Sequence, residues 1–178
     1  MKLYHTGTME IRSPDIHHGR KNADFGQGFY LTPDMDFACR WTGENAVINE
    51  YELDEEGLAI HRFSRDRDWF DYIFRNRRVK DTLKADVVIG PIANDTIFET
   101  LGVITSGYIE PEDAMKLLMI GPEYIQASIK TEKAVRHLRW IRAEKIEKGR
   151  DELREAEQEE YSRAFAEVMQ EIFKEQAQ

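Results

Sequence analysis

Residues 24–32 read Asp-Phe-Gly-Gln-Gly-Phe-Tyr-Leu-Thr and are the most informative segment of the sequence. Gly26 and Gly28 flank one polar residue, and glycine allows positive φ angles and a close approach of a ligand or a second strand to the backbone. The apolar run at 29–31 follows at once and favours a half-buried strand. We therefore expect a tight turn leading into a short strand, on which Tyr30 presents a ring face and a hydroxyl to a ligand.

An earlier strand is expected at the N-terminus, where residues 2–8 read Lys-Leu-Tyr-His-Thr-Gly-Thr and end in polar turn residues. We expect His5 on this strand and Tyr30 after the Gly-x-Gly turn to line one nucleotide cleft. The turn at Gly7 leaves backbone N–H and C=O groups free to pair with a ligand that carries an amide. A lone histidine or tyrosine more often has an ordinary structural role, so this hypothesis rests on the pair.

Length and charge narrow the class of protein. The chain has 178 residues, of which 41% are hydrophobic, which suits one globular domain with a core. Its formal net charge of −9 argues against a large, non-specific phosphate-binding surface. A local basic patch stays open at Arg75, Arg77 and Arg78, either as a solvated helix face or as a site for an acidic target or a nucleic-acid phosphate.

The single cysteine and the absence of long apolar runs limit the compartment. Cys39 alone excludes an internal disulfide, and no Cys/His group has the spacing of a zinc site. No apolar run reaches the length of a signal peptide or of a membrane span. We therefore expect a cytoplasmic protein with no metal and no membrane partner.

Residues 1–148 alternate strand and helix patterns, which predicts a mixed, strand-rich α+β domain. The predicted strands are 46–53, 58–63, 86–92 and 124–129, and the predicted helices are 66–78, one that begins at Pro111, and one that begins after Thr131 and includes Leu138 and Ile141. We expect 58–63 to pair with 46–53 as a hairpin, and Pro91 to mark an edge, a bulge or a strand end.

Residues 149–178 are predicted to form an acidic, amphipathic C-terminal helix. The segment has no proline and no glycine after Gly149. Its apolar residues recur at three- and four-residue steps, at Tyr161, Phe165, Val168, Met169 and Ile172. We expect this stripe to pack on the body of the domain, with a homodimer formed through the helix as the alternative.

Two of these segments resemble the motifs of a known superfamily. Residues 4–8 and 25–32 resemble the first and second motifs of ADP-ribosyltransferases, closest to the branch of diphtheria toxin and poly(ADP-ribose) polymerases. Within that branch, residues 2–146 are similar to a small, poorly characterised bacterial family. That family also carries counterparts of Gly19-Arg20, Asn76-Arg77 and the segment 89–95.

The resemblance implies a split β-sheet core with peripheral helices, to which this chain adds its long C-terminal helix. It implies NAD as the co-substrate and transfer of ADP-ribose to a macromolecular acceptor, which the sequence does not identify among protein, nucleic acid or a small molecule. Small stand-alone members in bacteria are often toxins or toxin–antitoxin components, so the resemblance also implies a toxin role with an antitoxin as partner.

The resemblance assigns a role in NAD binding to each matching position near the N-terminus. His5 is expected to hold the adenosine-side ribose through a hydroxyl hydrogen bond. The backbone at Thr6 and Gly7 is expected to pair with the nicotinamide amide. A glycine usually follows the histidine directly in this branch, whereas Thr6 intervenes here, so the amide contact is open between these two residues.

Other positions complete the expected NAD site. Tyr30 is expected to stack against nicotinamide or shape its pocket, and Trp41 lies close to where a second aromatic falls in the polymerase branch. Gly28 permits close approach, and Arg20 is a candidate for the pyrophosphate, with a surface arginine as the equal alternative.

The third motif departs from the family pattern. A glutamate usually opens a late strand and stabilises the positive charge that develops as nicotinamide leaves. Here Gln126 is the best-placed polar residue, flanked by Glu123 and Glu132. Glutamine accepts a hydrogen bond from a ribose hydroxyl but supplies no charge and no general base. The catalytic candidates are therefore Gln126, Tyr30 and His5. A non-catalytic module that binds NAD or ADP-ribose, and an interaction protein that acts through its C-terminal helix, are the alternatives.

Overall fold

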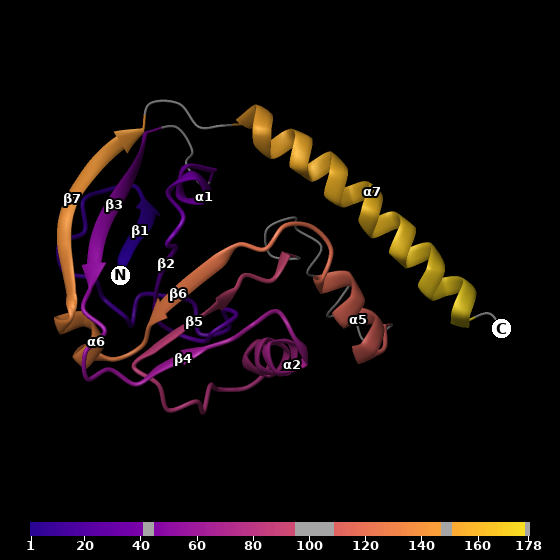
Figure 1. The fold of residues 1–178 in the computed structure, drawn as a ribbon, viewed down its shortest axis with the longest axis horizontal. Helices are drawn as coiled ribbons and strands as arrows, with labels where there is room; N and C mark the ends of the chain where they lie inside the picture. Colours follow the sequence, from indigo (N-terminus) through magenta and orange to yellow (C-terminus); the bar gives the residue numbers. More distant parts are fainter. Residues whose placement is uncertain (41–44, 95–108, 147–150, 177–178) are drawn as a thin grey trace. The chain divides into compact units, whose positions relative to one another are not determined.

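A computed structural model of the chain describes residues 1–40, 45–94, 109–146 and 151–176. Over these residues it is a mixed α+β structure with two β-sheets and five helices, of which one is C-terminal (Figure 1). The chain divides into two units. The first comprises Met1–Pro91 and Tyr124–Arg150, and the second comprises Ile92–Glu123 and Asp151–Gln178.

The first sheet is antiparallel and belongs to the first unit. Its strand order is β1 (Lys2–Gly7), β3 (Ala46–Leu53) and β7 (Leu138–Ile146). In the β1–β3 register Leu3 lies opposite Tyr51 and His5 lies opposite Asn49. Because side chains alternate between the faces of a strand, Leu3, His5 and Gly7 share one face of β1.

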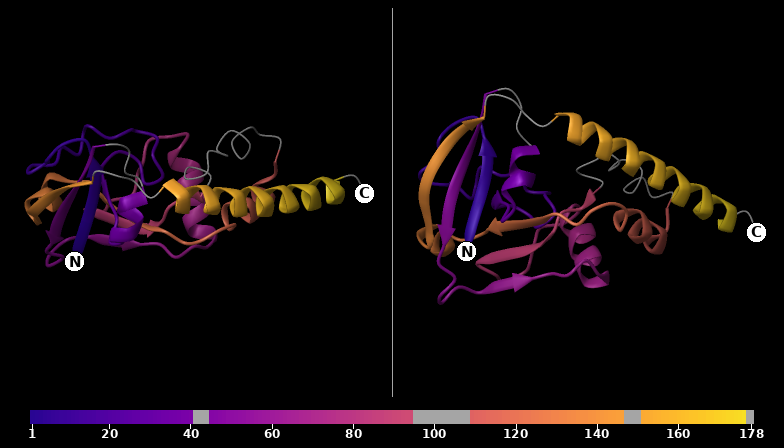
Figure 2. Two further views of the ribbon diagram at one scale, coloured as in Figure 1. Left: turned by 90° about the horizontal axis from the view of Figure 1, so that it is seen from above. Right: turned by 45° about the horizontal axis from the view of Figure 1, so that its top comes forward.

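The second sheet of this unit has four strands. Their order is β2 (Phe29–Leu31), β6 (Ile125–Ile129), β5 (Val87–Pro91) and β4 (Ile60–Arg62), and only the β5–β4 pair is parallel. The two sheets meet at Tyr4 and Thr32, which exchange backbone hydrogen bonds of 2.8 and 2.9 Å. Figure 2 shows the strands of the two sheets running in clearly different directions from this junction.

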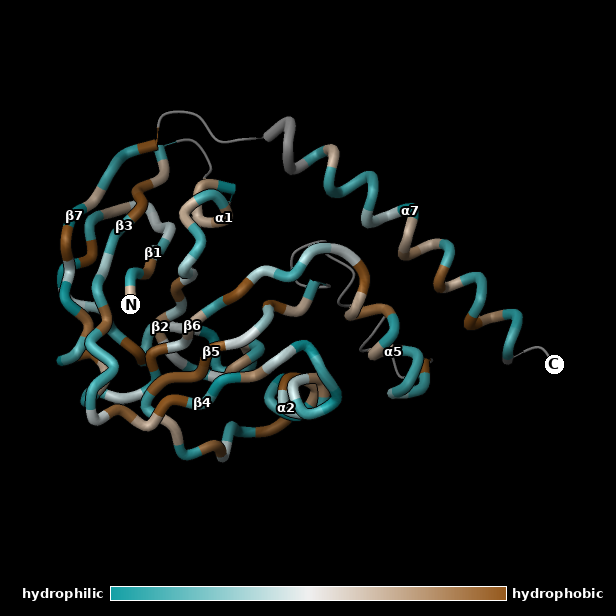
Figure 3. Tube along the Cα trace, viewed as in Figure 1, coloured by the Kyte–Doolittle hydropathy of each residue, from teal (hydrophilic) through white to brown (hydrophobic). Residues whose placement is uncertain are grey.

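A hydrophobic core lies between the two sheets. Its buried members alternate along the strands of both sheets, as the period of two in a strand requires. In Figure 3, brown hydrophobic segments lie along the strands of both sheets. The core residues on strands are Leu3, Tyr51, Leu53 and Leu138 of the first sheet, and Phe29, Leu31, Val87, Ile89, Ala127 and Ile129 of the second. This core holds β1 against β2, and with them the first two sequence motifs.

The other face of the second sheet carries aromatic residues and the helix α2 (Arg67–Asn76). The Asp66 side chain caps α2 by accepting from the Trp69 backbone N–H, and Trp69 Nε1 donates to the Pro91 carbonyl at 2.8 Å. Gly90 lies on the opposite face of β5 from the core residues, and a Cβ there would stand 3.2 Å from Phe25 Cζ. Phe25 in turn lies beside Tyr72 of α2.

The second unit is helical where it is described. It contains α5 (Pro111–Leu118), which begins with the expected proline, and α7 (Asp151–Gln176). The two helices contact each other, and Lys116 of α5 forms an ion pair of 3.3 Å with Glu175 of α7. Tyr161 and Ile172 are buried on the apolar stripe of α7. The predicted C-terminal helix is confirmed.

The predicted strand and helix elements are confirmed at 46–53, 66–78, 86–92, 124–129 and Pro111, and Pro91 ends its strand. The predicted hairpin is wrong, because 58–63 contributes β4 to the second sheet, where Ile60 pairs with Val87. Both edges of β3 are taken by β1 and β7. A hairpin partner therefore has no place beside it.

The helix predicted through Leu138 and Ile141 is also wrong. The helix α6 (Glu132–Arg136) is capped by Thr131 as expected but ends at Arg136, and β7 begins at Leu138. The four-residue step from Ala134 to Leu138 fits a helix and a following strand equally well. Residues 138–146 form a strand because they pair along the whole length of β3. Within the described ranges, no helix combines the length and apolar character that a bilayer crossing needs.

Candidate functional site

The ring of His5 lies between the two sheets. It packs on Phe29 with 4.4 Å between ring centroids, and its Nδ1 lies 2.7 Å from the carbonyl oxygen of Tyr30. A carbonyl only accepts hydrogen bonds, so Nδ1 carries the proton and donates it. Nε2 of the neutral ring is therefore left as the hydrogen-bond acceptor.

Burial favours this neutral form. It lowers the pKa of His5 below its ordinary value of 6.5, against a smaller opposing effect of the hydrogen bond to the Tyr30 carbonyl. Nε2 faces the position of Gly7, where a Cβ would stand 3.4 Å away from it. The lack of a side chain at Gly7 thus keeps the space beside the acceptor nitrogen uncrowded.

The side chain and the backbone groups of Thr6 point in different directions. Its hydroxyl donates to the Ala38 carbonyl of α1 (Met35–Arg40) at 2.7 Å, which ties β1 to that helix. Tyr4 bonds to Thr32 through both of its backbone groups, so these point away from β3. Backbone direction alternates along a strand. The N–H and C=O of Thr6, two residues on, therefore point away from β3 as well, whereas those of Gly7 point toward it.

Tyr30 closes the turn that precedes its own strand. Its hydroxyl donates to the Gly26 carbonyl at 2.6 Å and accepts from the Phe25 N–H at 3.0 Å. Gly26 has φ of +71°, so the turn suits glycine. Burial, reinforced by the Asp24 carboxylate, raises the pKa of Tyr30 above its ordinary range, and the phenol stays protonated.

His5 and Tyr30 meet through the backbone and not through their rings. Phe29 points into the core and contacts His5, and its neighbour Tyr30 points to the opposite face of β2. The two rings therefore lie on different faces of the second sheet. A single cleft lined by both rings is not the arrangement in this structure.

The packing of β6 explains why residue 28 is glycine. A Cβ at this position would stand 2.4 Å from Ser128 Oγ and 2.7 Å from the Ile129 carbonyl oxygen, both on β6. Contacts this short do not occur in folded proteins, so β6 can pack against this turn only because residue 28 is glycine. The close approach expected at Gly28 is here made by a strand.

Gln126 is buried on β6 and bonded to a carboxylate. Its Nε2 donates to Asp24 Oδ2 at 3.3 Å. Asp24 is itself buried and pairs with Arg77, with 2.7 Å between the guanidinium and Oδ1. The side chain of Asn76 adds a hydrogen bond of 3.1 Å to the Asp24 carbonyl. The buried pair orients Gln126, because Nε2 is the end of the amide that faces Asp24.

Sequence reasoning missed Asp24 as a site residue, although it brings a negative charge next to Gln126. Its position just before the Phe25-Gly26 turn was one available signal, and the Asn76-Arg77 pair was another. Asp24 and Arg77 lie 53 residues apart in the chain. Only folding shows that they belong to one cluster.

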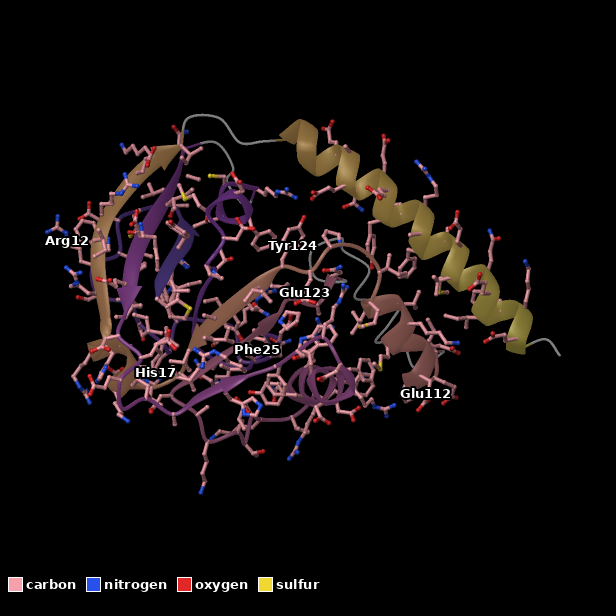
Figure 4. The ribbon with its side chains drawn as sticks, in the orientation of Figure 1. Arg12, His17, Phe25, Glu112, Glu123 and Tyr124 are labelled. Carbon is pink, nitrogen blue, oxygen red and sulfur yellow. The ribbon has the colours of Figure 1, made fainter. Side chains whose placement is uncertain are left out.

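The remaining candidates lie elsewhere. Arg20 is exposed in the loop before the turn, and Trp41 lies outside the described residues. Glu132, exposed, opens α6. Glu123 is exposed and directly precedes Tyr124, which is labelled with it in Figure 4.

The start of β6 is held against α1. The Tyr124 ring stacks on Phe37 of α1 with 4.2 Å between centroids, and its hydroxyl accepts a hydrogen bond of 2.5 Å from Arg40. Since Thr6 also bonds to α1, this helix joins the end of β1 to the start of the strand that carries Gln126. Within the described ranges, no three His, Cys, Asp or Glu residues are grouped so that they could hold a metal ion.

Comparison with known proteins places the chain in one family. A family model described as a protein of unknown function (DUF3990) matches residues 1–140, and the chain belongs to this family. No curated protein and no solved structure matches it.

Proposed function

We propose that this DUF3990 protein is an NAD-dependent ADP-ribosyltransferase-like enzyme. It would cleave the nicotinamide–ribose bond and transfer ADP-ribose to a macromolecular acceptor. The observation that carries the proposal is the hydrogen bond between His5 Nδ1 and the Tyr30 carbonyl. It joins the two motifs that resemble this superfamily and leaves Nε2 as a neutral acceptor, which is the group that a ribose hydroxyl needs.

The backbone of Thr6 supports recognition of the nicotinamide amide. Its N–H and C=O point away from β3, on the side where Tyr4 meets Thr32. One donor and one acceptor on a single residue complement the oxygen and the NH₂ group of a carboxamide. Of the two residues left open by the sequence, the proposal therefore assigns this contact to Thr6.

Gln126 is the proposed residue at the reacting ribose, which requires NAD to reach from the core face at His5 to the Tyr30 face of β6, where the Gln126 side chain lies. Loss of nicotinamide develops positive charge at C1′, and a nearby dipole or anion stabilises it. Gln126 supplies an amide dipole, and Asp24 behind it supplies a carboxylate whose charge is largely balanced by Arg77. This arrangement supports slower chemistry than a glutamate would. A toxin role, an antitoxin partner and a cytoplasmic location belong to this proposal on the resemblance alone.

Two further functions have observations in their favour. A non-catalytic module that binds NAD or ADP-ribose is favoured by Gln126, which is uncharged, 8% exposed and already bonded to Asp24. An interaction protein that acts through α7, including a homodimer, is favoured by Phe173, an apolar side chain that is 57% exposed.

The test is incubation of the purified full chain with NAD labelled in its ADP-ribose half, together with cell lysate. Transferred label and released nicotinamide are measured for the wild type, for His5→Ala, and for His61→Ala as a control on an exposed histidine. Loss of both signals in His5→Ala alone supports the enzyme. NAD binding without nicotinamide release supports the module. If NAD neither binds nor shifts the melting temperature, the proposal fails.

A further inference from the structure

A cavity of about 910 Å³ opens on the first unit. Its walls come from the 21–27 loop, from the end of α2 and the segment that follows it up to Asp86, and from Lys130 and Thr131 after β6. Neither His5, Tyr30 nor Gln126 lines it. The cavity adjoins the Gln126 cluster through Asn76 and Arg77, which line it and bond to Asp24.

The charge of the cavity is opposite to that of the chain. Its lining includes six basic residues, Lys21, Arg77, Arg78, Lys80, Lys84 and Lys130, and two acidic ones, Asp81 and Asp86. The whole chain carries a net charge of −9. A concave basic surface on an acidic protein is a local feature that attracts an anion small enough to enter it.

The bases of the cavity fall into two groups. Arg77 is held by Asp24, and Lys130 is held by Asp81 and the Phe25 carbonyl, so both are buried parts of the wall. Lys21, Arg78, Lys80 and Lys84 are exposed around them. Lysine and arginine side chains of this kind supply several donors that converge on the oxygens of a phosphate.

We propose that this cavity binds a small phosphorylated ligand of nucleotide size. Its volume lies within the range of about 300–1,000 Å³ that is typical of small-molecule sites. Its wall also offers apolar surface at Val79, Leu83 and Ala85 for the uncharged part of such a ligand. The chain's large negative charge opposes a long polyanion, which favours a small phosphorylated molecule over a nucleic-acid strand.

The cavity shares a wall with the Gly26 turn. A Cβ at Gly26 would stand 2.9 Å from Asp81 Cβ and 3.2 Å from Lys130 Nζ. Asp81 also accepts a hydrogen bond of 3.0 Å from the Tyr72 hydroxyl. A ligand phosphate beside Lys130 lies behind the turn that Tyr30 closes, and not on its other side at His5. A ligand there does not occupy the space at His5 and Thr6, so we expect it to bind together with NAD.

Calorimetric titration of the full chain with ADP, pyrophosphate, inorganic phosphate and adenosine tests the proposal. ADP is expected to bind and adenosine to fail. Lys80→Glu/Lys84→Glu is expected to weaken ADP binding by at least about tenfold, because both substitutions reverse a charge at the cavity. The control Lys145→Glu/Arg163→Glu makes the same charge change at exposed positions away from the lining and is expected to bind as the wild type does.

The comparison of pyrophosphate with ADP shows which part of the ligand the cavity recognises. Pyrophosphate that binds as tightly as ADP shows recognition of the phosphates alone, and weaker binding of pyrophosphate shows that the nucleoside also contacts the wall. The proposal is overturned if neither binds, if the control loses as much affinity as the cavity variant, if saturating NAD abolishes ADP binding, or if a single-stranded oligonucleotide binds more tightly than ADP.

Discussion

The imidazole of His5 donates from Nδ1 to the carbonyl oxygen of Tyr30 across 2.7 Å, so a side chain of β1 is bonded to the backbone of β2. This bond fixes which nitrogen of the ring carries the proton. It also means that the first and second motifs are one structural unit, although their side chains lie on different faces of β2. A substitution at either residue is therefore expected to alter the position of the other.

The stability of the protein is expected to depend on pH through His5. Its pKa is lowered in the folded state, so the unfolded chain takes up a proton first as the pH falls below about 6.5. The contribution of the neutral ring is present above that pH and is lost as the pH falls toward the folded-state pKa. Urea denaturation between pH 7.5 and 5.5 should show a smaller loss of stability in His5→Gln than in the wild type. The exposed His61→Gln should keep the wild-type slope. Equal slopes in all three proteins would remove His5 as the cause.

Gln126→Leu is expected to separate binding of NAD from its cleavage. The substitution removes the amide dipole that we place at the reacting ribose, so nicotinamide release should fall by about a hundredfold. The dissociation constant of NAD should change little, because the other proposed contacts remain. Single-turnover release and equilibrium titration measure the two quantities. Gln170→Leu, on the exposed surface of α7, should leave both unchanged. A matched loss of affinity and rate would instead make Gln126 a binding residue.

Gly28→Ala is expected to destabilise the fold by about 1–3 kcal/mol, because its Cβ would collide with Ser128 Oγ and the Ile129 carbonyl of β6. Ser128→Ala removes the nearer of these two atoms. In the double variant, part of the loss should therefore be recovered. Thermal or urea denaturation of the four proteins gives the coupling energy. Strictly additive losses would show that Gly28 is required for another reason.

Asp24→Asn is expected to cost about 3–5 kcal/mol of folding free energy, because it leaves the Arg77 guanidinium buried without its carboxylate. Glu52 and Arg139 form the comparison, since they pair on the exposed surface of the first sheet. Glu52→Gln should change stability by less than about 1 kcal/mol. Urea denaturation at pH 7 measures both. Similar small losses in the two variants would mean that the Asp24 cluster is more hydrated than its burial indicates.

Tyr161→Ala on α7 is expected to destabilise the second unit by about 3 kcal/mol, because the side chain is 2% exposed. Phe173→Ala, at a position that is 57% exposed on the same helix, should have little effect on stability. Thermal melting measures the first change, and light scattering measures the molecular mass of each variant. A fall in mass on Phe173→Ala would instead show that this face of α7 joins two copies of the chain.

Local pattern was enough for most elements of the fold. The β-branched run at 86–92 and the alternation at 46–53 predicted strands, and Pro111 and Thr131 marked helix starts, since each signal acts between residues close in sequence. Strand pairing was not predictable in the same way. A strand at 60–62 can pair at any open sheet edge, and in the structure it pairs with β5.

For the site, the motifs and residue types could be predicted from the sequence, namely His5 before a polar turn, the Gly-x-Gly turn before Tyr30, and Gln126 on a late strand. Which of these groups face one another is seen only in the folded chain. Folding directs the Tyr30 ring away from His5, places Asp24 and Arg77 against Gln126, and gathers the bases of the cavity from three segments. The face on which a side chain lies, and its neighbours there, depend on strand register and sheet packing, which are set by contacts between residues far apart in the chain.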